Sequence, residues 1–206
     1  MDRKFFDAKN DREKNLKEEK YHIKKKLKQL FPVVYVKTLV DQKTTLVETE
    51  KIIQMEYFYD LLSEYDDMEI NKTPIILSVD NIPQSSFETI LEWAYLQTEE
   101  FLLPRDKLIN TRTSIKSVLH PKAIAFFEKV LKKKNKDRFK YDYAALCVLL
   151  NSANLLNYES LHKCAINYIA YLMAHAIDSE TLMKKITMCE ETPDKSFEQE
   201  KLKILL

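Results

Sequence analysis

Cysteine and histidine are the residue types here with the widest chemistry, because they bind metals, transfer protons and act as nucleophiles. The members of this set are Cys147, Cys164, Cys189, His22, His120, His162 and His175. The three cysteines form no CxxC pair, and their odd number favours reduced thiols over a disulfide framework. His162 and Cys164 resemble half of a metal site, but two residues apart on a predicted helix they point to different faces. We therefore expect no metal site and no cofactor.

Glycine is absent from the 206 residues, whereas average usage of about 7% would give roughly 14. A dinucleotide-binding loop, a P-loop and a GxSxG nucleophile elbow all need backbone conformations that glycine adopts most easily. The sequence therefore excludes these three enzyme classes in their usual form. The histidines and acidic residues also show no triad or paired-carboxylate spacing, so the sequence predicts a non-enzymatic protein without a small-molecule substrate.

The net charge of +1 hides two basic segments. Residues 1–30 contain 11 Lys or Arg against 6 Asp or Glu, and Leu131–Lys140 contains 6 against 1. Such runs are typical of solvated segments or weak anion contacts. They lack the interleaved aromatic residues that stack on bases, so nucleic acid is not the favoured partner. No apolar run approaches the roughly 20 residues of a membrane span, and no secretory signal is visible, so we expect an intracellular protein.

The N-terminal half predicts a small sheet and helices. Residues 33–36 and 44–47 are rich in β-branched residues around a short turn, which indicates a β-hairpin. Residues 50–65 carry apolar residues at spacings of three and four, which predicts one helix. Residues 74–79 predict a third strand, and Ser85-x-x-Glu88 predicts a capping box at the start of the next helix.

The C-terminal half predicts helices. Pro121 is expected to open one helix, and Tyr143–Leu155 to form another. Asn157 is the expected N-cap of a helix that runs to about His175. Further helices are expected after Asp178 or Ser179, and after Thr192-Pro193. The predicted fold class is α+β.

The helix after Asn157 has two apolar faces about 100° apart. One is formed by Leu161, Ala165, Tyr168 and Leu172, and the other by Ile166, Ile169, Met173 and Ile177. A surface helix normally has one apolar stripe. Two explanations are open for the second face: the C-terminal helices fold back over it, or another protein covers it. The thin apolar content of the C-terminal helices favours a partner, because such segments often order only on binding.

Three segments of the chain together carry the pattern of a known family. They are "LCVLLNSANLLNYESLHKCAINYIAYLMAHAIDSETLMKKI", "TTLVETEKIIQMEYFYDLLSEY" and "PIILSVDNIPQSSFETILEWAYLQ". The first resembles the C-terminal half of the S-phase kinase-associated protein 1 family, the linker subunit of SCF ubiquitin ligases. The other two are similar to the strand-and-helix segments of that family, with Trp93 in the matching place. Two departures stand out: Leu155 occupies the position of a family tyrosine, and His162 that of a leucine.

The resemblance implies a BTB/POZ fold, a three-stranded sheet packed by helices with additional C-terminal helices. It implies that the protein acts in ubiquitin-dependent degradation, in cytoplasm and nucleus, as a non-enzymatic adaptor between an F-box protein and a cullin. The implied F-box-binding residues are Leu161, Ile166, Ile169, Met173, Leu182, Ile186 and Phe197. The implied cullin-binding residues are Asn154 and Leu155.

The domain limits that follow are a charged extension at 1–30 and a BTB/POZ-like domain at 32–176 with an insertion near 98–140. Residues 177–206 would complete the F-box-binding surface. Two alternatives stay open: a BTB-fold scaffold used outside ubiquitin ligation, self-associating or structural, and a nucleic-acid-associating protein that uses its lysine runs.

Overall fold

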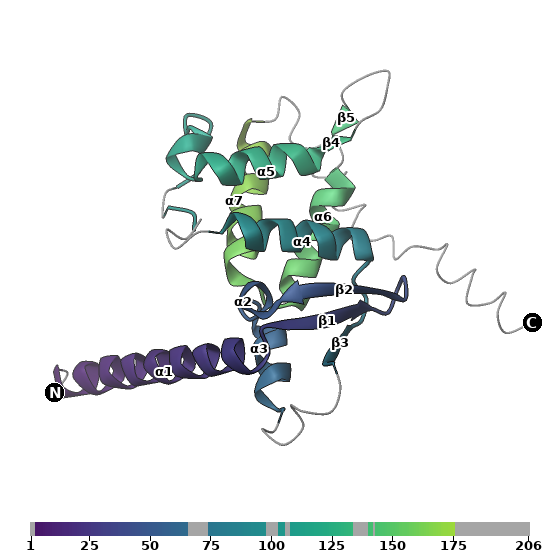
Figure 1. Cartoon of the computed structure of the whole chain (residues 1–206). Coiled ribbons are helices and arrows are strands. Elements are labelled where there is room, and N and C mark those ends of the chain that lie inside the picture. Colours follow the sequence, from purple (N-terminus) through teal and green to yellow (C-terminus); the bar gives the residue numbers. More distant parts are fainter. Residues whose placement is uncertain are drawn as a thin grey trace, which may run out of the picture. The chain divides into compact units, whose positions relative to one another are not determined.

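The computed structural model describes residues 3–65, 74–97, 103–105, 108–133, 140–141 and 143–175, and their side chains except in 3–13, 132–133 and 140–141. These residues form a mixed α+β structure in which a three-stranded sheet is packed by helices, with further helices towards the C-terminus (Figure 1). The predicted fold class is therefore confirmed. The chain divides into two compact units, Met1–Ala94 and Tyr95–Leu206, and the predicted domain limits stay a prediction.

The sheet of the first unit has the strand order β2-β1-β3. Strand β1 (Val33–Thr38) pairs antiparallel with β2 (Lys43–Glu48) and parallel with β3 (Ile76–Val79). The predicted hairpin and third strand are thus confirmed. In the hairpin turn Gln42 has a φ of 52°, a left-handed conformation that this glycine-free chain gives to a side-chain-bearing residue.

The inner face of the sheet carries part of the core. Alternate residues of β1 are buried, as expected for a strand with one packed face. The buried strand residues on this face include Val34, Val36, Thr38, Val47, Leu77 and Val79. Phe58 and Phe87 add an edge-to-face aromatic contact at 6.1 Å between ring centroids, so helices on both sides of β3 in the sequence contribute to one core.

The predicted helix over residues 50–65 is wrong as a single element, because the structure has two. Helix α2 (Thr49–Ile52) ends before a turn, and α3 (Glu56–Ser63) begins after it. Met55 is extended there, with φ −88° and ψ 120°. Ile53 and Met55 are both buried. The turn therefore lets apolar side chains that would lie at different angles on one continuous helix enter the same core.

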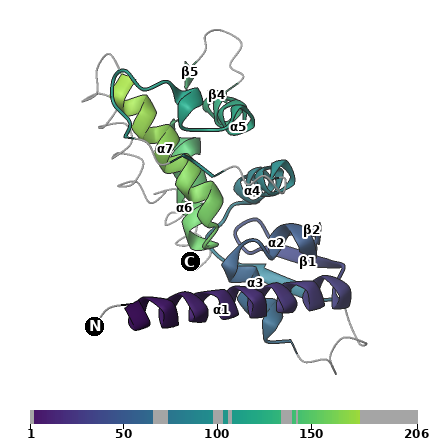
Figure 2. The same cartoon turned by 90° about the vertical axis from the view of Figure 1, so that its left-hand side faces the viewer.

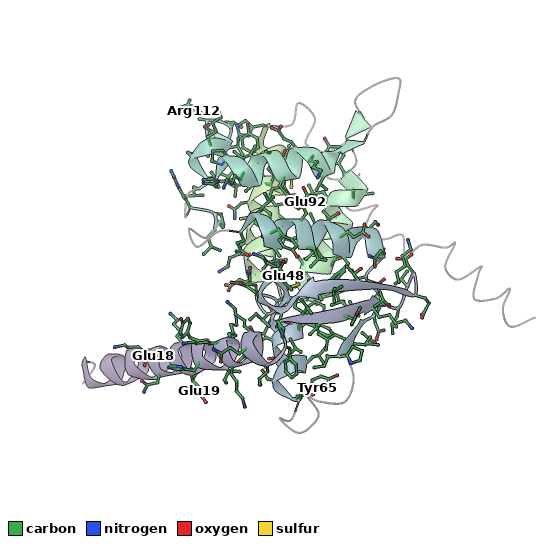
Figure 3. All side chains as sticks on the ribbon, viewed as in Figure 1. Glu18, Glu19, Glu48, Tyr65, Glu92 and Arg112 are labelled. Atoms are coloured by element: carbon green, nitrogen blue, oxygen red, sulfur yellow. The ribbon has the colours of Figure 1, made fainter. Side chains whose placement is uncertain are left out.

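The charged N-terminal segment is helical over α1 (Arg3–Leu30), and its C-terminal end packs on α2 and α3 (Figures 1 and 2). Leu27 is buried in this contact, and so is Phe31 just beyond the helix. The Phe31 ring also meets Tyr65 edge to face, with 6.3 Å between centroids. The end of α1 is thus part of the first unit, whereas Glu18 and Glu19, labelled in Figure 3, are exposed.

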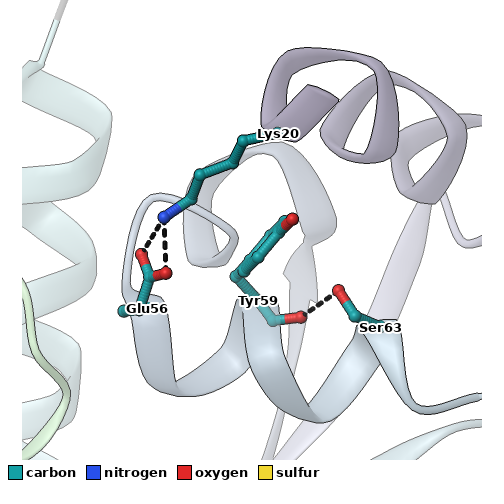
Figure 4. Close-up of polar contacts among 4 residues, drawn as sticks. All are labelled: Lys20, Glu56, Tyr59 and Ser63. Atoms are coloured by element: carbon teal, nitrogen blue, oxygen red, sulfur yellow. Dashed lines mark hydrogen bonds and ion pairs between the residues drawn. The ribbon is translucent and has the colours of Figure 1, made fainter. Parts of the chain in front are cut away.

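A polar cluster joins α1 to α3 (Figure 4). Lys20 Nζ donates to both carboxylate oxygens of Glu56. The Lys20 and Lys24 ammonium groups lie 4.9 and 5.4 Å from the centroid of the Tyr59 ring, a cation–π arrangement. Burial, followed by the charge of Lys20, lowers the pKa of Lys24. The contact uses the lysines of α1 to attach this helix to the unit.

Helix α4 (Gln84–Leu96) begins one residue before the predicted capping box, so the assignment of Ser85 as its cap is wrong. The backbone N–H of Gln84 instead donates to the Asp41 carboxylate in the hairpin turn. A carboxylate at the positive end of a helix is favourable. The cap comes from a residue distant in sequence, which explains why local spacing did not reveal it.

The second unit holds the remaining described helices and a two-residue-strand hairpin. Its elements are η1 (Ile115–Ser117), α5 (Pro121–Leu131), β4 (Lys132–Lys133), β5 (Lys140–Tyr141), α6 (Tyr143–Leu155) and α7 (Glu159–His175). The predicted helix start at Pro121 and the predicted range of α6 are confirmed. His120 caps α5, because its Nδ1 accepts from the Lys122 N–H at 3.3 Å.

Candidate functional site

The candidate surface lies on α6 and α7, which pack side by side (Figure 2). Between them Asn157 has a φ of 48°. The Asn157 N–H donates to the Asn154 carbonyl at 2.9 Å, and the Tyr158 N–H donates to the Ala153 carbonyl at 2.8 Å. These two bonds are the Schellman motif. Asn157 is therefore the left-handed residue that ends α6, and its predicted role as the N-cap of α7 is wrong.

Three of the four residues on one apolar face of α7 are packed inside the protein, and the fourth, Leu172, is half-buried. Leu161, Ala165 and Tyr168 are all buried. The Tyr168 ring stacks on Phe127 of α5, with 5.0 Å between centroids and 24° between planes. Leu161 has no exposed area, so in this structure it supports the fold and is not accessible to an F-box protein.

The second apolar face of α7 is only partly covered. Ile166 is 45% exposed, and Ile169 and Met173 are half-buried. On the same exposed side Lys163 forms an ion pair with Glu159 one turn earlier. The helix thus presents isoleucine and methionine side chains next to solvated charges, which is the pattern of an interaction surface with a polar rim.

The remaining predicted site residues fall into two groups. Asn154 and Leu155 are exposed at the C-terminal end of α6, where Leu155 keeps 53% of its surface in solvent. Leu182, Ile186 and Phe197 lie outside the described residues. The structure thus brings together Ile166, Ile169 and Met173 on α7, and it leaves the predicted cullin-binding pair accessible on α6.

An exposed stripe on α6 was missed by the sequence analysis. Val148 is a large exposed aliphatic residue seven positions before Leu155. Asn151, between them, is also exposed. Because residues three, four and seven apart share a helix face, this spacing in the sequence contained the signal. It was overlooked because α6 is apolar nearly all round, so periodicity alone did not tell its solvent side from its core side.

Burial keeps two ionisable groups of this region, Cys164 and Tyr158, in their neutral forms. Burial raises the pKa of the Cys164 thiol to about 12, which leaves very little of the nucleophilic thiolate at neutral pH. Burial also raises the pKa of Tyr158, whose hydroxyl donates to Gln97 Oε1. His175 Nδ1 lies 3.0 Å from the Tyr171 carbonyl. What α7 offers to a partner is therefore mainly apolar contact.

A scan against protein-family models finds no match for this chain, and a search of curated proteins finds none either. Within the ranges that the structure covers, no three His, Cys, Asp or Glu side chains are grouped as a metal ion would require. None of the helices described combines the length and apolar content needed to cross a bilayer.

Proposed function

We propose that this chain is an adaptor of an SCF-type ubiquitin ligase, which joins an F-box substrate receptor to a cullin and performs no chemistry itself. The proposal combines the resemblance of three segments to the S-phase kinase-associated protein 1 family with the mixed α+β structure. In this role the protein would act in the cytoplasm and nucleus. The observation that carries the proposal is the difference between the two apolar faces of α7.

The partly exposed face of α7 is better explained as a binding surface than as part of the core. Leu161, Ala165 and Tyr168 are buried by the chain itself, whereas Ile166 is 45% exposed and Ile169 and Met173 are half-buried. Covering aliphatic side chains of this size is worth about 1.5–3 kcal/mol each when burial is complete. An amphipathic segment of an F-box protein laid against this face would gain that free energy, in the manner of helix-in-groove recognition.

The proposed partner surface is smaller than the one expected from the sequence. Leu161 is omitted because it is fully buried. Ile166, Ile169 and Met173 form its centre, and the Glu159–Lys163 ion pair lies at its polar edge. His162, which stands where the family has a leucine, is half-buried.

The experiment that tests F-box binding is a titration of the full chain with a recombinant F-box fragment. Ile166→Asp should weaken binding by about 2 kcal/mol or more, roughly 30-fold, because the carboxylate would be desolvated without a partner. Ile166 suits this change better than Ile169, since its exposure leaves the free protein little affected. Leu46→Asp, at an exposed leucine on the sheet, is the matched control and should bind normally.

The outcome against the proposal is equally concrete. If the correctly folded wild-type chain binds no member of a panel of F-box fragments, the proposed adaptor function is wrong. If Ile166→Asp binds normally, the F-box surface does not lie on this face of α7.

The cullin arm is tested at Leu155. Replacing Leu155 by tyrosine restores the family side chain at a 53% exposed position, so the larger ring fits without overpacking the core. The Leu155→Tyr chain, loaded with an F-box fragment, should bind a cullin N-terminal fragment more tightly, and Leu155→Ala should not. Equal affinities would place the cullin surface elsewhere. F-box binding without any cullin binding would select a BTB-fold scaffold used outside ubiquitin ligation.

A further inference from the structure

The outer face of the three-stranded sheet exposes large apolar side chains. In β1, Val34 and Val36 point into the core, so their neighbours Val33 and Tyr35 point outward. Leu46 of β2 and Ile76 of β3 are also directed to solvent, and these four outward residues are between 38% and 56% exposed. A solvent-facing sheet surface is ordinarily polar, so this composition needs a reason.

The strand register places three of these side chains in one row. Tyr35 is directly opposite Leu46 in β2 and directly opposite Ile76 in β3. Directly paired side chains on one face are about 4.5–5.5 Å apart at Cβ. Leu46, Tyr35 and Ile76 therefore form a continuous apolar row across the whole width of the sheet. Exposed apolar patches of a few hundred Å² with polar surroundings mark interaction sites.

Two opposite charges lie on the same face, one on each side of the row. Glu48 pairs with Val33 towards one end of the strands, and Lys37 pairs with Thr44 and Ser78 towards the other. Glu48, labelled in Figure 3, is exposed and makes no side-chain cap to α2. Among the described residues neither charge takes part in an ion pair. Along the strand direction, this face therefore carries an acidic residue, then the apolar row, then a basic residue.

This arrangement is complementary to itself. A two-fold axis parallel to the row places two copies face to face with their strands in opposite directions, so that the row of one copy lies on the same row of the other. The same rotation places the basic end of one face over the acidic end of the other. Lys37 of one copy then lies near Glu48 of the other copy. The two residues are offset sideways by one strand spacing, about 4.8 Å, and their sheets are about 10 Å apart. Two long side chains can span this separation. Two-fold pairing of one surface with itself is the commonest oligomer symmetry.

We propose that the outer face of the sheet docks a second copy of this chain. The apolar row of Leu46, Tyr35 and Ile76 packs on its own equivalent, and two Lys37–Glu48 ion pairs flank it. Four side chains that are each 38% to 56% exposed give a small contact beside the roughly 800 Å² per partner of a stable interface. The dimer is therefore weak, with a dissociation constant in the micromolar range, about 10–100 µM. All the residues named for this interface lie on the sheet, and none is on α7.

The test is sedimentation equilibrium of the full chain over about 1–300 µM, a range that brackets the expected affinity. The mass should rise from 24.4 kDa towards twice that value. Tyr35→Lys, which puts a charge at the centre of the row, should raise the dissociation constant at least about tenfold. Tyr35→Thr is a second variant that suits a strand and removes the ring, and it should weaken the dimer in the same direction.

The ion pairs provide a test that only a second copy can pass. Lys37→Glu and Glu48→Lys should each weaken the dimer, because each puts like charges opposite one another, and the double variant should restore it. Lys25→Glu, on the exposed surface of α1, is the matched control and should leave the dimer unchanged. Fluorescence of the buried Trp93 checks that each variant is folded.

The result that overturns the proposal is a monomer at every concentration, even if some other molecule binds this face. A dimer that survives Tyr35→Lys, or that the double charge reversal does not restore, overturns it as well. Ile166→Asp should leave the dimer intact, so failure here is distinguishable from failure of the proposed F-box surface.

Discussion

Gln84 is the residue whose replacement should most directly test how the sheet is joined to α4. Its side chain is nearly buried and its amide is almost fully hydrogen-bonded. Oε1 accepts from the Thr38 hydroxyl at 2.9 Å, and Nε2 donates to Thr45 Oγ1 at 2.8 Å and to Glu88 Oε1 at 2.9 Å. One side chain thus connects both strands of the hairpin to the first turn of the helix.

Gln84→Met keeps the length of this side chain and removes its polar atoms. Exposed Glu88 and half-buried Thr45 can turn to water, so their lost bonds cost little. Thr38 has no exposed area and keeps only a 3.4 Å contact to the Lys43 carbonyl. Leaving a buried hydroxyl poorly satisfied costs about 1–3 kcal/mol. We expect the free energy of unfolding to fall by about 2 kcal/mol.

A double-mutant cycle with Thr38→Val isolates the central bond. Thr38→Val alone should cost about 1 kcal/mol by leaving the Gln84 carbonyl without its donor. Once that hydroxyl is gone, adding Gln84→Met should cost less, and the coupling should be about 1 kcal/mol. Urea unfolding followed by Trp93 fluorescence is suitable, because Trp93 is the single tryptophan, is buried and lies on α4.

Two outcomes would refute this reasoning. Costs that add to within about 0.3 kcal/mol would mean that the bond is energetically irrelevant. A neutral Gln84→Met would mean the same for the whole cluster. Ser85→Ala is the control: because Asp41 supplies the cap, this change should alter stability by less than about 0.5 kcal/mol, and a loss near 1 kcal/mol would restore Ser85 as the cap.

Two further predictions concern the second unit. Asn157→Ala should lower the free energy of unfolding by about 1 kcal/mol, because alanine resists the left-handed φ of 48°; Asn157→Gly should cost nothing or stabilise, and equal stability of the two variants in urea unfolding would contradict the Schellman assignment. The second prediction follows from the pKa of Cys164, which is about 12 when folded and 9.0 as the ordinary value. The folded state keeps a proton that the unfolded state loses, so this contribution to stability is complete below pH 9 and is lost as the pH rises towards 12. Between pH 9 and about pH 10 the unfolding free energy should fall by about 1 kcal/mol more in the wild type than in Cys164→Ala; parallel pH profiles would contradict the burial of this thiol.

Secondary structure marked by local composition was predictable from the sequence. The β-branched residues on both sides of the turn located β1 and β2, and the apolar run before Asn157 located α6, because these patterns depend on neighbours in the chain. Pro121 was predictable as a helix start since its fixed φ and missing N–H suit a first helical position.

Sites that depend on distant residues were not predictable in this way. Apolar residues at spacings of three and four suggested one helix over 50–65. The structure instead has a turn between α2 and α3, and this turn allows Ile53 and Met55 to be buried in the same core. Ser85 had the local sequence of a capping residue, yet the N–H at the start of α4 donates to the distant Asp41 carboxylate. In each case a long-range contact outweighed a local preference worth about 1 kcal/mol.

For the candidate surface, the sequence by itself determined that α7 has two apolar faces and that glycine is unavailable for left-handed positions. Only the tertiary structure decided which face is buried, that Leu161 belongs to the core, and that Leu46, Tyr35 and Ile76 meet in one row. The physical reason is that polarity is a property of each side chain, whereas exposure is a property of whatever packs against it. The elements that pack there are distant in the chain, so no local pattern contains them.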